Sequence, residues 1–302
     1  MTHSPFGGVF PVLPTVFTER GDVDADGMKA VVDYVVASGA DGLVFPGLAS
    51  EYDMLSLDER EAGIALIGAA VAGRVRFVVG ASSDDVGDSL RLAAAGAAAG
   101  ASAAMVMTPR ALGPDVDALS DFYGGLGAKA GLPIMLQNAP SPMGLGLAAD
   151  AVARIVAASD AVAWVKEENM PCGQRISALL GSGVPHLEGI FGGAGGRYIT
   201  DELARGAIGS MPAAETPEVH VALMRAHLAG DRAEVWRLYE ALLPILMIQA
   251  VYRWRLTKEV LRRRGVIGSA YTRAAGPQFD DVDQQELGIV LDRLQRAYAA
   301  RS

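Results

Sequence analysis

The sequence predicts an α/β protein, a (β/α)8 barrel of the TIM-barrel type with a C-terminal helical extension. Short β-branched or apolar runs alternate eight times with longer Ala-, Leu- and Arg-rich segments at helical period. No linker of disordered composition interrupts this series, and 302 residues suit a barrel of this type. After residue 230 the strand pattern stops, and only helical patterns follow.

The elements can be placed in order from these patterns. The eight predicted strands cover residues 9–15, 42–46, 76–80, 103–107, 133–138, 162–166, 186–191 and 207–211. The predicted helices that follow them cover residues 26–38, 58–72, 85–99, 117–130, 148–158, 172–181, 197–204 and 216–229. Two further helices are expected near 231–264 and 283–299. The chain is thus expected to form a barrel over residues 1–230 and an extension over residues 231–302, packed on the barrel.

An open doubly wound sheet is the alternative architecture. Such a sheet normally carries a Gly-rich dinucleotide-binding loop after its first strand. Residues 9–19 contain no such loop, so the closed barrel is favoured.

Composition limits the partners of the protein. A net charge of −9 and a pI near 5.0 argue against a nucleic-acid or anionic-membrane surface, which needs a concentrated basic face. No window approaches the roughly 20 apolar residues that span a bilayer. A single cysteine, Cys172, excludes an intrachain disulfide and fits a reducing cytoplasm, so a cytoplasmic location is expected. The four histidines lack metal-ligand spacing, so no metal is expected.

Lys166 closes the sixth predicted strand and is one of four lysines in the chain. Desolvation at the end of an apolar strand lowers the pKa of a lysine toward the range where the neutral amine attacks a carbonyl. The alternative is a lysine whose head group reaches water along its apolar stem. Because chemistry in such barrels collects at the carboxyl ends of the strands, the position favours a nucleophile that forms a Schiff base.

Three other strand ends carry small or polar residues that can meet a ligand. The turn after strand two offers backbone N–H groups that can cradle a carboxylate. For any one of these segments taken alone, a glycine that permits a tight turn is the favoured explanation. The candidates are Gly47, Leu48, Ala49, Ser50 and Glu51 after strand two, Gln137 and Asn138 at the end of strand five, and Gly192 and Gly193 after strand seven.

Together, in this order and spacing, these segments resemble the dihydrodipicolinate synthase/N-acetylneuraminate lyase family of class I aldolases and dehydratases. The resemblance covers nearly the whole chain. It implies that Lys166 forms an imine with the keto group of pyruvate or another small 2-keto acid, and that the loop at 47–51 holds the carboxylate. It further implies that this covalent imine replaces any cofactor, and that the protein is a homo-oligomer, a homotetramer.

Several positions depart from the synthase pattern of that family. Leu48 and Ala49 stand where two threonines are usual, and Gln137 replaces the tyrosine that relays protons to the imine. Arg110 lies in a segment where paired tyrosines are expected, and Pro142 replaces an arginine that binds the second substrate. The condensation reaction of lysine biosynthesis is therefore not expected.

The remaining chemistry needs a proton carrier. A lysine imine acidifies the C3–H bond and permits either loss of a C4 hydroxyl or cleavage of the C3–C4 bond. Ser50 and Glu51 are the nearest replacements for the tyrosine, although Glu51 equally suits a structural role. Gln137 and Asn138 are expected to orient the substrate by hydrogen bonds. Strand alternation points Glu167, the residue after the lysine, away from the barrel axis.

The Ser50–Glu51 pair, Gln137 and the segment 192–197 are similar to the branch of the family that dehydrates 2-keto-3-deoxy sugar acids. Arg110 and Arg197 suit an acidic, hydroxylated substrate, because a guanidinium binds a carboxylate through two hydrogen bonds. The sequence therefore predicts a Schiff-base lyase that favours dehydration. A pyruvate-dependent aldolase is the first alternative. A non-catalytic keto-acid-binding or interaction protein is the second, and a lysine kept at a buried position argues against it.

Overall fold

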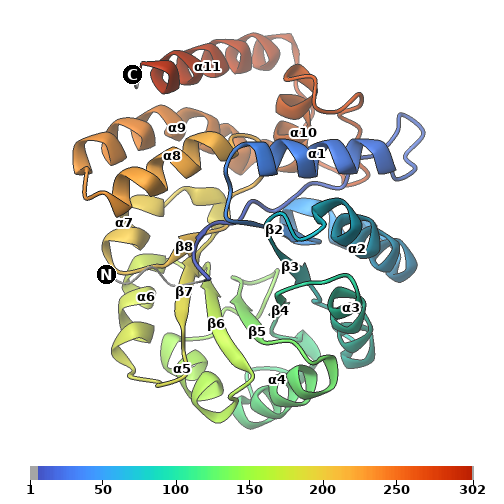
Figure 1. Cartoon of the computed structure of the whole chain (residues 1–302), viewed down its shortest axis with the longest axis vertical. Coiled ribbons are helices and arrows are strands. Elements are labelled where there is room, and N and C mark those ends of the chain that lie inside the picture. Colours follow the sequence, from blue (N-terminus) through green and yellow to red (C-terminus); the bar gives the residue numbers. More distant parts are fainter. Residues whose placement is uncertain (1–5, 301–302) are drawn as a thin grey trace.

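The structure is a computed structural model that describes residues 6–300. Its eight parallel strands form one sheet in the order β1-β8-β7-β6-β5-β4-β3-β2, which closes nearly into a barrel and confirms the predicted (β/α)8 fold (Figure 1). The strands are β1 (Gly8–Val9), β2 (Gly42–Phe45), β3 (Arg76–Gly80), β4 (Ala103–Met107), β5 (Ile134–Asn138), β6 (Val162–Glu167), β7 (Gly189–Gly192) and β8 (Gly209–Ser210). Val12 bridges to both Val44 and Ala213 and so closes the gap between the two ends of the sheet.

Helices follow the strands around the outside of the barrel (Figure 1). They are α1 (Ala25–Ala37), α2 (Leu57–Val71), α3 (Val86–Ala98), α4 (Val116–Ala130), α5 (Ala149–Ala158), α6 (Cys172–Gly181), α7 (Ile199–Ala204) and α8 (Pro217–Leu228). Several begin at polar caps: Asp24, Ser56, Asp85 and Asp115 accept hydrogen bonds from the first-turn N–H groups. Short 3-10 helices η1 (Leu48–Ser50), η2 (Tyr52–Met54), η3 (Arg110–Leu112) and η4 (Ala194–Gly196) lie in the loops after β2, β4 and β7.

The barrel interior is an apolar core of its own. Phe6 stacks on Trp164 with ring centroids 4.0 Å apart, and Phe10 meets Phe191 edge to face at 5.3 Å. Along β6, Trp164 belongs to this inner core, whereas Val165 packs in the outer core between barrel and helices. Because strand side chains alternate, the next inward position is Lys166. The inner core therefore lies directly beneath this lysine.

Two expected elements differ most from the observed ones, and the strands expected over residues 186–191 and 207–211 are observed over Gly189–Gly192 and Gly209–Ser210. The first strand, expected over residues 9–15, is reduced to Gly8–Val9 and the single bridge at Val12. Pro11 and Pro14 explain this, because proline has no N–H to donate to a ladder. The expected helix over residues 231–264 is broken at Arg253, whose backbone φ of 47° and ψ of −120° lie outside the helical region.

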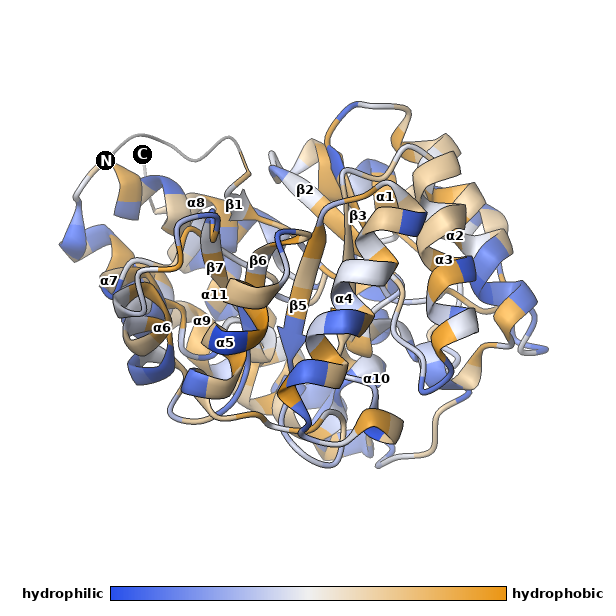
Figure 2. Ribbon diagram, turned by 90° about the horizontal axis from the view of Figure 1, so that it is seen from below, coloured by the Kyte–Doolittle hydropathy of each residue, from blue (hydrophilic) through white to orange (hydrophobic). Residues whose placement is uncertain are grey.

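The break at Arg253 divides the C-terminal segment into α9 (Arg232–Tyr252) and α10 (Trp254–Arg263), and α11 (Asp281–Ala299) follows. Helix α9 lies against α8 and α11, outside the barrel (Figure 1). Helix α10 turns toward the carboxyl ends of the strands, where the indole N–H of Trp254 donates to the Leu48 carbonyl at 2.6 Å. In Figure 2 the largely hydrophobic β5 ends in hydrophilic residues on the side where α10 lies. The C-terminal helices thus help to build the open end of the barrel.

Candidate active site

Lys166 lies at the carboxyl end of β6 and is only 3% exposed. In the sheet it is the register partner of Gln137 on β5 and of Phe191 on β7. Its Nζ is 3.5 Å from Oε1 of Glu168, the one ion pair found for this lysine in residues 6–300. A buried amine with a single long contact keeps hydrogen-bonding capacity for a ligand.

Glu168 is held firmly beside this amine. Its Oε2 accepts a hydrogen bond from the side-chain amide of Gln137 at 2.6 Å, and its Oε1 accepts one from the backbone N–H of Ala194 at 3.0 Å. Burial raises the pKa of the Glu168 carboxyl, but the positive charge of Lys166 and these donors outweigh burial and hold the pKa below its usual range. No role is predicted for this residue from the sequence alone. The two-residue period of a strand gives the signal, because it puts residues 166 and 168 on the same face.

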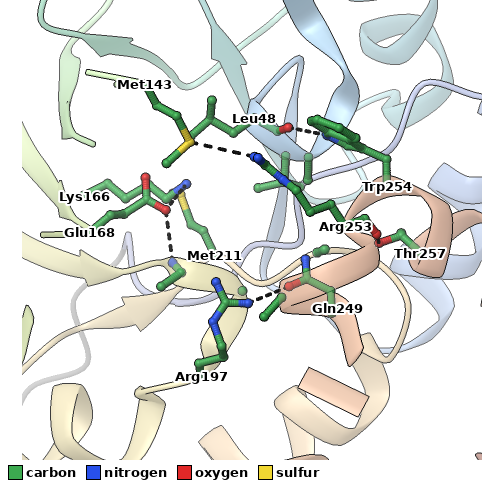
Figure 3. A pocket seen from close by; sticks show the side chains of 16 residues that line it. Leu48, Met143, Lys166, Glu168, Arg197, Met211, Gln249, Arg253, Trp254 and Thr257 are labelled. Atoms are coloured by element: carbon green, nitrogen blue, oxygen red, sulfur yellow. Dashed lines mark hydrogen bonds and ion pairs between the residues drawn. The ribbon is translucent and has the colours of Figure 1, made fainter. Parts of the chain in front are cut away.

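A cavity of about 250 Å³ opens in front of Lys166 and Glu168 (Figure 3). The end of β6 and the residue after it supply Lys166 and Glu168 from one side, and the junction of α9 and α10 supplies the opposite side. Glu168 is the only carboxylate among the described residues that line it, and no tyrosine is among them. The lining residues are Val12, Leu48, Ala49, Met143, Lys166, Glu168, Ala194, Gly195, Arg197, Met211, Ala213, Gln249, Ala250, Arg253, Trp254 and Thr257.

The loop after β2 meets the cavity through Leu48 and Ala49. These residues open the short helix η1, and the first N–H groups of a helical turn have no acceptor within the turn. Ser50 is fully buried and does not line the cavity. Its hydroxyl donates to the Leu13 carbonyl and accepts the Gly47 N–H at 2.8 Å. The hydroxyl is therefore engaged in holding the loop in place.

Glu51 is also turned away from the cavity. It is fully buried, its backbone φ is 54°, and its carboxylate forms an ion pair with Lys258 of α10. The backbone N–H of Ala274 donates to Oε2 of Glu51 at 2.7 Å. This geometry corresponds to the structural alternative for Glu51. No role for Lys258 can be predicted from the sequence, because only the fold brings it next to the loop after β2.

The two polar residues at the end of β5 point in opposite directions. Gln137 points inward and binds Glu168, as described above. Asn138 points outward: its amide exchanges hydrogen bonds of 3.0 Å with the backbone of Leu147 and donates to Glu167 at 2.9 Å. Glu167 in turn lies 3.2 Å from the guanidinium of Arg175 on α6. Asn138 and Glu167 therefore fasten β5 and β6 to the outer layer.

Gly192 and Gly193 leave room for two carboxylates. A Cβ at Gly192 would stand 1.9 Å from Oε2 of Glu202, and a Cβ at Gly193 would stand 2.4 Å from Oε1 of Glu168. Any side chain at residue 193 would therefore displace Glu168. Burial raises the pKa of Glu202 to about 7, and the only side-chain donor to it in the described part of the chain is the Cys172 thiol, 3.2 Å from Oε1.

The two arginines singled out in the sequence lie in different places. Arg110 is largely exposed, forms an ion pair with Asp84 and does not line the cavity of Lys166. Arg197 lines that cavity and donates to the side-chain oxygen of Gln249 at 2.6 Å. A second lining arginine, Arg253, was not anticipated. A helix break without glycine or proline at the break leaves no mark in the sequence.

The arrangement fits nucleophilic catalysis on a carbonyl compound. An amine stands beside a carboxylate in a cavity that also offers backbone N–H groups and guanidinium groups for an anion. Residues 6–300 contain no group of three or more His, Cys, Asp or Glu side chains placed to hold a metal ion. They also contain no helix long and apolar enough to cross a membrane.

A (β/α)8 barrel with a buried lysine at the carboxyl ends of its strands defines a class of enzymes that work through a lysine imine. The model of the dihydrodipicolinate synthetase family matches residues 5–293, and the chain belongs to this family. Members of the family are class I Schiff-base lyases, aldolases or dehydratases that use a lysine imine and no metal. The protein is therefore a lyase of this type, and the resemblance seen in the sequence is confirmed.

Individual relatives divide between two activities. The chain is 28% identical to L-2-keto-3-deoxyarabonate dehydratase of Azospirillum brasilense, over 95% of this chain and 94% of the relative. It is 28% identical to 4-hydroxy-tetrahydrodipicolinate synthase of Rhizobium meliloti (strain 1021), over 88% of this chain and 86% of the relative. Among solved structures, dihydrodipicolinate synthase of Rhodopseudomonas palustris superposes with a TM-score of 0.88 at 25% identity, covering 96% of this chain and 98% of the other. YagE of E. coli K12, solved in complex with pyruvate, shares the fold with a TM-score of 0.87 at 23% identity, covering 96% and 99%.

Proposed function

We propose that the protein dehydrates a 2-keto-3-deoxy sugar acid through an imine on Lys166, with Glu168 as the proton carrier. The observation that carries the proposal is the carboxylate of Glu168, 3.5 Å from Nζ of Lys166 in a cavity whose described lining has no other carboxylate. The similarity to L-2-keto-3-deoxyarabonate dehydratase of Azospirillum brasilense supports the same substrate class.

In the first step the neutral amine of Lys166 attacks C2 of the keto acid, and loss of water gives a protonated imine. The N–H groups of Leu48 and Ala49 receive the substrate carboxylate, since both residues line the cavity. Glu168 then takes a proton from C3, and the electron pair of that bond moves into the enamine. The protonated carboxyl returns its proton to the C4 hydroxyl, which leaves as water, and the C3–C4 double bond forms. Water finally hydrolyses the imine and frees the lysine.

Dehydration is favoured over retro-aldol cleavage because of the strength of the base. Cleavage of the C3–C4 bond needs removal of a proton from the C4 hydroxyl, which is far less acidic than a C3–H bond next to a protonated imine. Glu168, with its pKa held below the usual range, is a weak base suited to the more acidic C3–H. The hydrogen bonds from Gln137 and Ala194 fix its orientation.

The proposal is tested by borohydride reduction in the presence of a panel of 2-keto acids, followed by peptide mass analysis and product analysis. We expect a mass-shifted Lys166 peptide and a dehydrated product. Release of pyruvate from a 2-keto-3-deoxy sugar acid would identify an aldolase instead. Absence of any adduct at Lys166 with every keto acid would favour the non-catalytic binding protein. The homotetramer and the cytoplasmic location stay predictions. Light scattering can test the oligomeric state, and cell fractionation can test the location.

A further inference from the structure

Two arginines at the cavity have no carboxylate partner in the described part of the chain. Arg197 enters from the loop after β7, and Arg253 from the junction of α9 and α10 (Figure 3). Neither takes part in an ion pair within 4.0 Å among residues 6–300, whereas other arginines, such as Arg91, Arg110 and Arg273, do. Arg197 is half-buried, and a half-buried guanidinium without an anionic partner attracts an anionic ligand, while Arg253 is exposed at the same cavity and is free to meet that ligand.

Arg197 is held in position for such a ligand. Its Nη1 donates to Oε1 of Gln249 at 2.6 Å, which leaves its other N–H groups available. Gly195 gives it space, since a Cβ there would stand 3.2 Å from Nη1 of Arg197 and 3.0 Å from Oε1 of Gln249. Burial lowers the pKa of Arg197, and the charge of Arg253 acts in the same direction. Glu215, buried nearby, accepts instead from Thr257 at 3.0 Å.

Arg253 occupies a backbone position that is unfavourable for any side chain. Its φ of 47° and ψ of −120° belong to a region that glycine adopts readily and other residues rarely. The guanidinium lies over the Trp254 ring at 4.4 Å, and its only side-chain hydrogen bond in the described residues is a weak one to the sulfur of Met143, at 3.8 Å. A strained position that carries an unpaired cation at a cavity points to a role in binding.

The charge balance of the cavity gives the ligand chemistry. Lys166, Arg197 and Arg253 supply three positive groups against the single carboxylate of Glu168. A protonated imine keeps the positive charge of Lys166, so imine formation does not remove this excess. The carboxylate at C1 of the keto acid meets neutral N–H groups at Leu48 and Ala49. A substrate with only that one charge leaves the two guanidinium groups without a partner.

We propose that Arg197 and Arg253 bind a second anionic group at the far end of the substrate, so that the preferred 2-keto-3-deoxy acid carries two negative groups. This inference rests on the proposed function and narrows its substrate class. A terminal carboxylate and a terminal phosphate ester share the chemistry that a guanidinium recognises. Both differ from the terminal hydroxymethyl group of a simple sugar acid.

The test compares 2-keto-3-deoxy acids of equal chain length that end in a hydroxymethyl group, a carboxylate or a phosphate ester. We expect kcat/KM to be about 10- to 100-fold higher for one of the two anionic substrates, mainly through KM. Which of them is preferred decides between the two sources of the anion. The preference should disappear in Arg197→Ala and in Arg253→Ala. Arg91→Ala, which removes an exposed ion pair with Glu61 on the outer helices, serves as the matched control.

Pyruvate provides the second readout, because it has no far end. Borohydride trapping of pyruvate on Lys166 should proceed equally in the wild type and in both variants. Equal kcat/KM for all three substrates, or a preference for the hydroxymethyl form, would overturn the inference while leaving the imine chemistry intact. Loss of pyruvate trapping in the variants would place the arginines at the C1 carboxylate and also overturn it. No trapping in the wild type would refute the proposed function itself.

Arg253→Gly separates binding from folding. Glycine relieves the backbone strain but removes the same guanidinium as alanine does. We expect Arg253→Gly to melt at a higher temperature than Arg253→Ala, while both lose the preference for the anionic substrate. If the glycine variant keeps the preference, the arginine side chain does not bind the substrate.

Discussion

Residues 6–300 contain two buried lysine–glutamate pairs, and the two lysines differ in how many hydrogen bonds they form. Lys258 pairs with Glu51, both side chains are 0% exposed, and the lysine also donates to the Tyr271 carbonyl at 2.8 Å. Lys166 has one contact of 3.5 Å to Glu168 and lines the cavity. Burial alone therefore does not make a lysine available for reaction, whereas access to a cavity and unused hydrogen-bonding capacity do.

The pKa of Lys258 supports the same conclusion. Burial lowers the pKa of Lys258 to about 8, a value that would suit attack on a carbonyl. Lys258 nevertheless lies outside the cavity, with its ammonium 4.3 Å from the Phe17 ring centre and a carboxylate on another side. We therefore expect keto acids to react at Lys166 and not at Lys258.

The largest effect is expected from Lys166→Met. Without the amine no imine forms, so we expect turnover to fall by about 10³-fold or more and the borohydride adduct to vanish. Lys129→Met, at an exposed lysine of α4, is the control for charge loss. An adduct that persists in Lys166→Met, carried by Lys258, would reverse the roles of the two pairs.

Glu168→Gln tests the other half of the reactive pair. Glutamine keeps the shape of the side chain but cannot take up the C3 proton, so we expect kcat to fall by about 10²- to 10⁴-fold. Trapping of pyruvate on Lys166 should persist. Exchange of the C3 protons of pyruvate with solvent, followed by NMR, measures the proton transfer directly and should slow by a similar factor.

Ser50→Ala is the counterpart in the loop after β2. The Ser50 hydroxyl binds the backbone of Leu13 and Gly47, so its loss should cost about 1–3 kcal/mol of unfolding free energy. The exchange of C3 protons should slow far less than in Glu168→Gln. An equal loss of exchange in a variant that stays folded would move the proton carrier to the loop.

Breaking the structural pair should act on stability. Lys258→Met leaves the Glu51 carboxylate buried without its cation, and we expect a loss of about 3–5 kcal/mol in denaturant unfolding. Glu51→Gln should cost a similar amount, while the double variant should recover much of it because no unpaired charge remains. Additive losses in the double variant would show that the two residues act separately.

Glu202 is a buried carboxylate with no cation partner among residues 6–300, and its effect is on the pH dependence of stability. Burial raises the pKa of Glu202 from 4.5 to about 7, so the folded state binds its proton more tightly than the unfolded state does. The contribution of Glu202 to stability is therefore full below about pH 4.5 and is lost as pH rises to about 7, a change of about 3 kcal/mol. Glu202→Gln should flatten the unfolding free energy over this range relative to the wild type. An unchanged pH profile would contradict the assignment.

The sequence was sufficient for the parts of the site that depend on local pattern. Lys166 could be predicted because an apolar strand ends on it, and the outward direction of Glu167 follows from strand alternation. The same alternation places Glu168, two residues after Lys166, on the same face as the lysine. The sequence marks Ser50 and Glu51 as candidate proton carriers, but their hydrogen-bond partners in the fold determine whether they can reach a ligand.

Those partners could not be read from the sequence, because they are distant along the chain. Lys258 lies 207 residues from Glu51, and Ala274 lies 223 residues from it. Arg253 stands at a helix break that the local sequence does not predict. Local patterns thus predict which residues stand at the open end of the barrel, and long-range contacts decide which of them stay available for chemistry.

The contact between Glu51 and residues 258–274 also sets an order of events during synthesis. The loop after β2 leaves the ribosome before its cation and its backbone donor, which lie 207 and 223 residues further along the chain. Contacts of such long sequence separation form late in folding, because the intervening chain must close first. The nascent barrel therefore acquires the final conformation of the loop after β2 only once residues 258–274 have been synthesised.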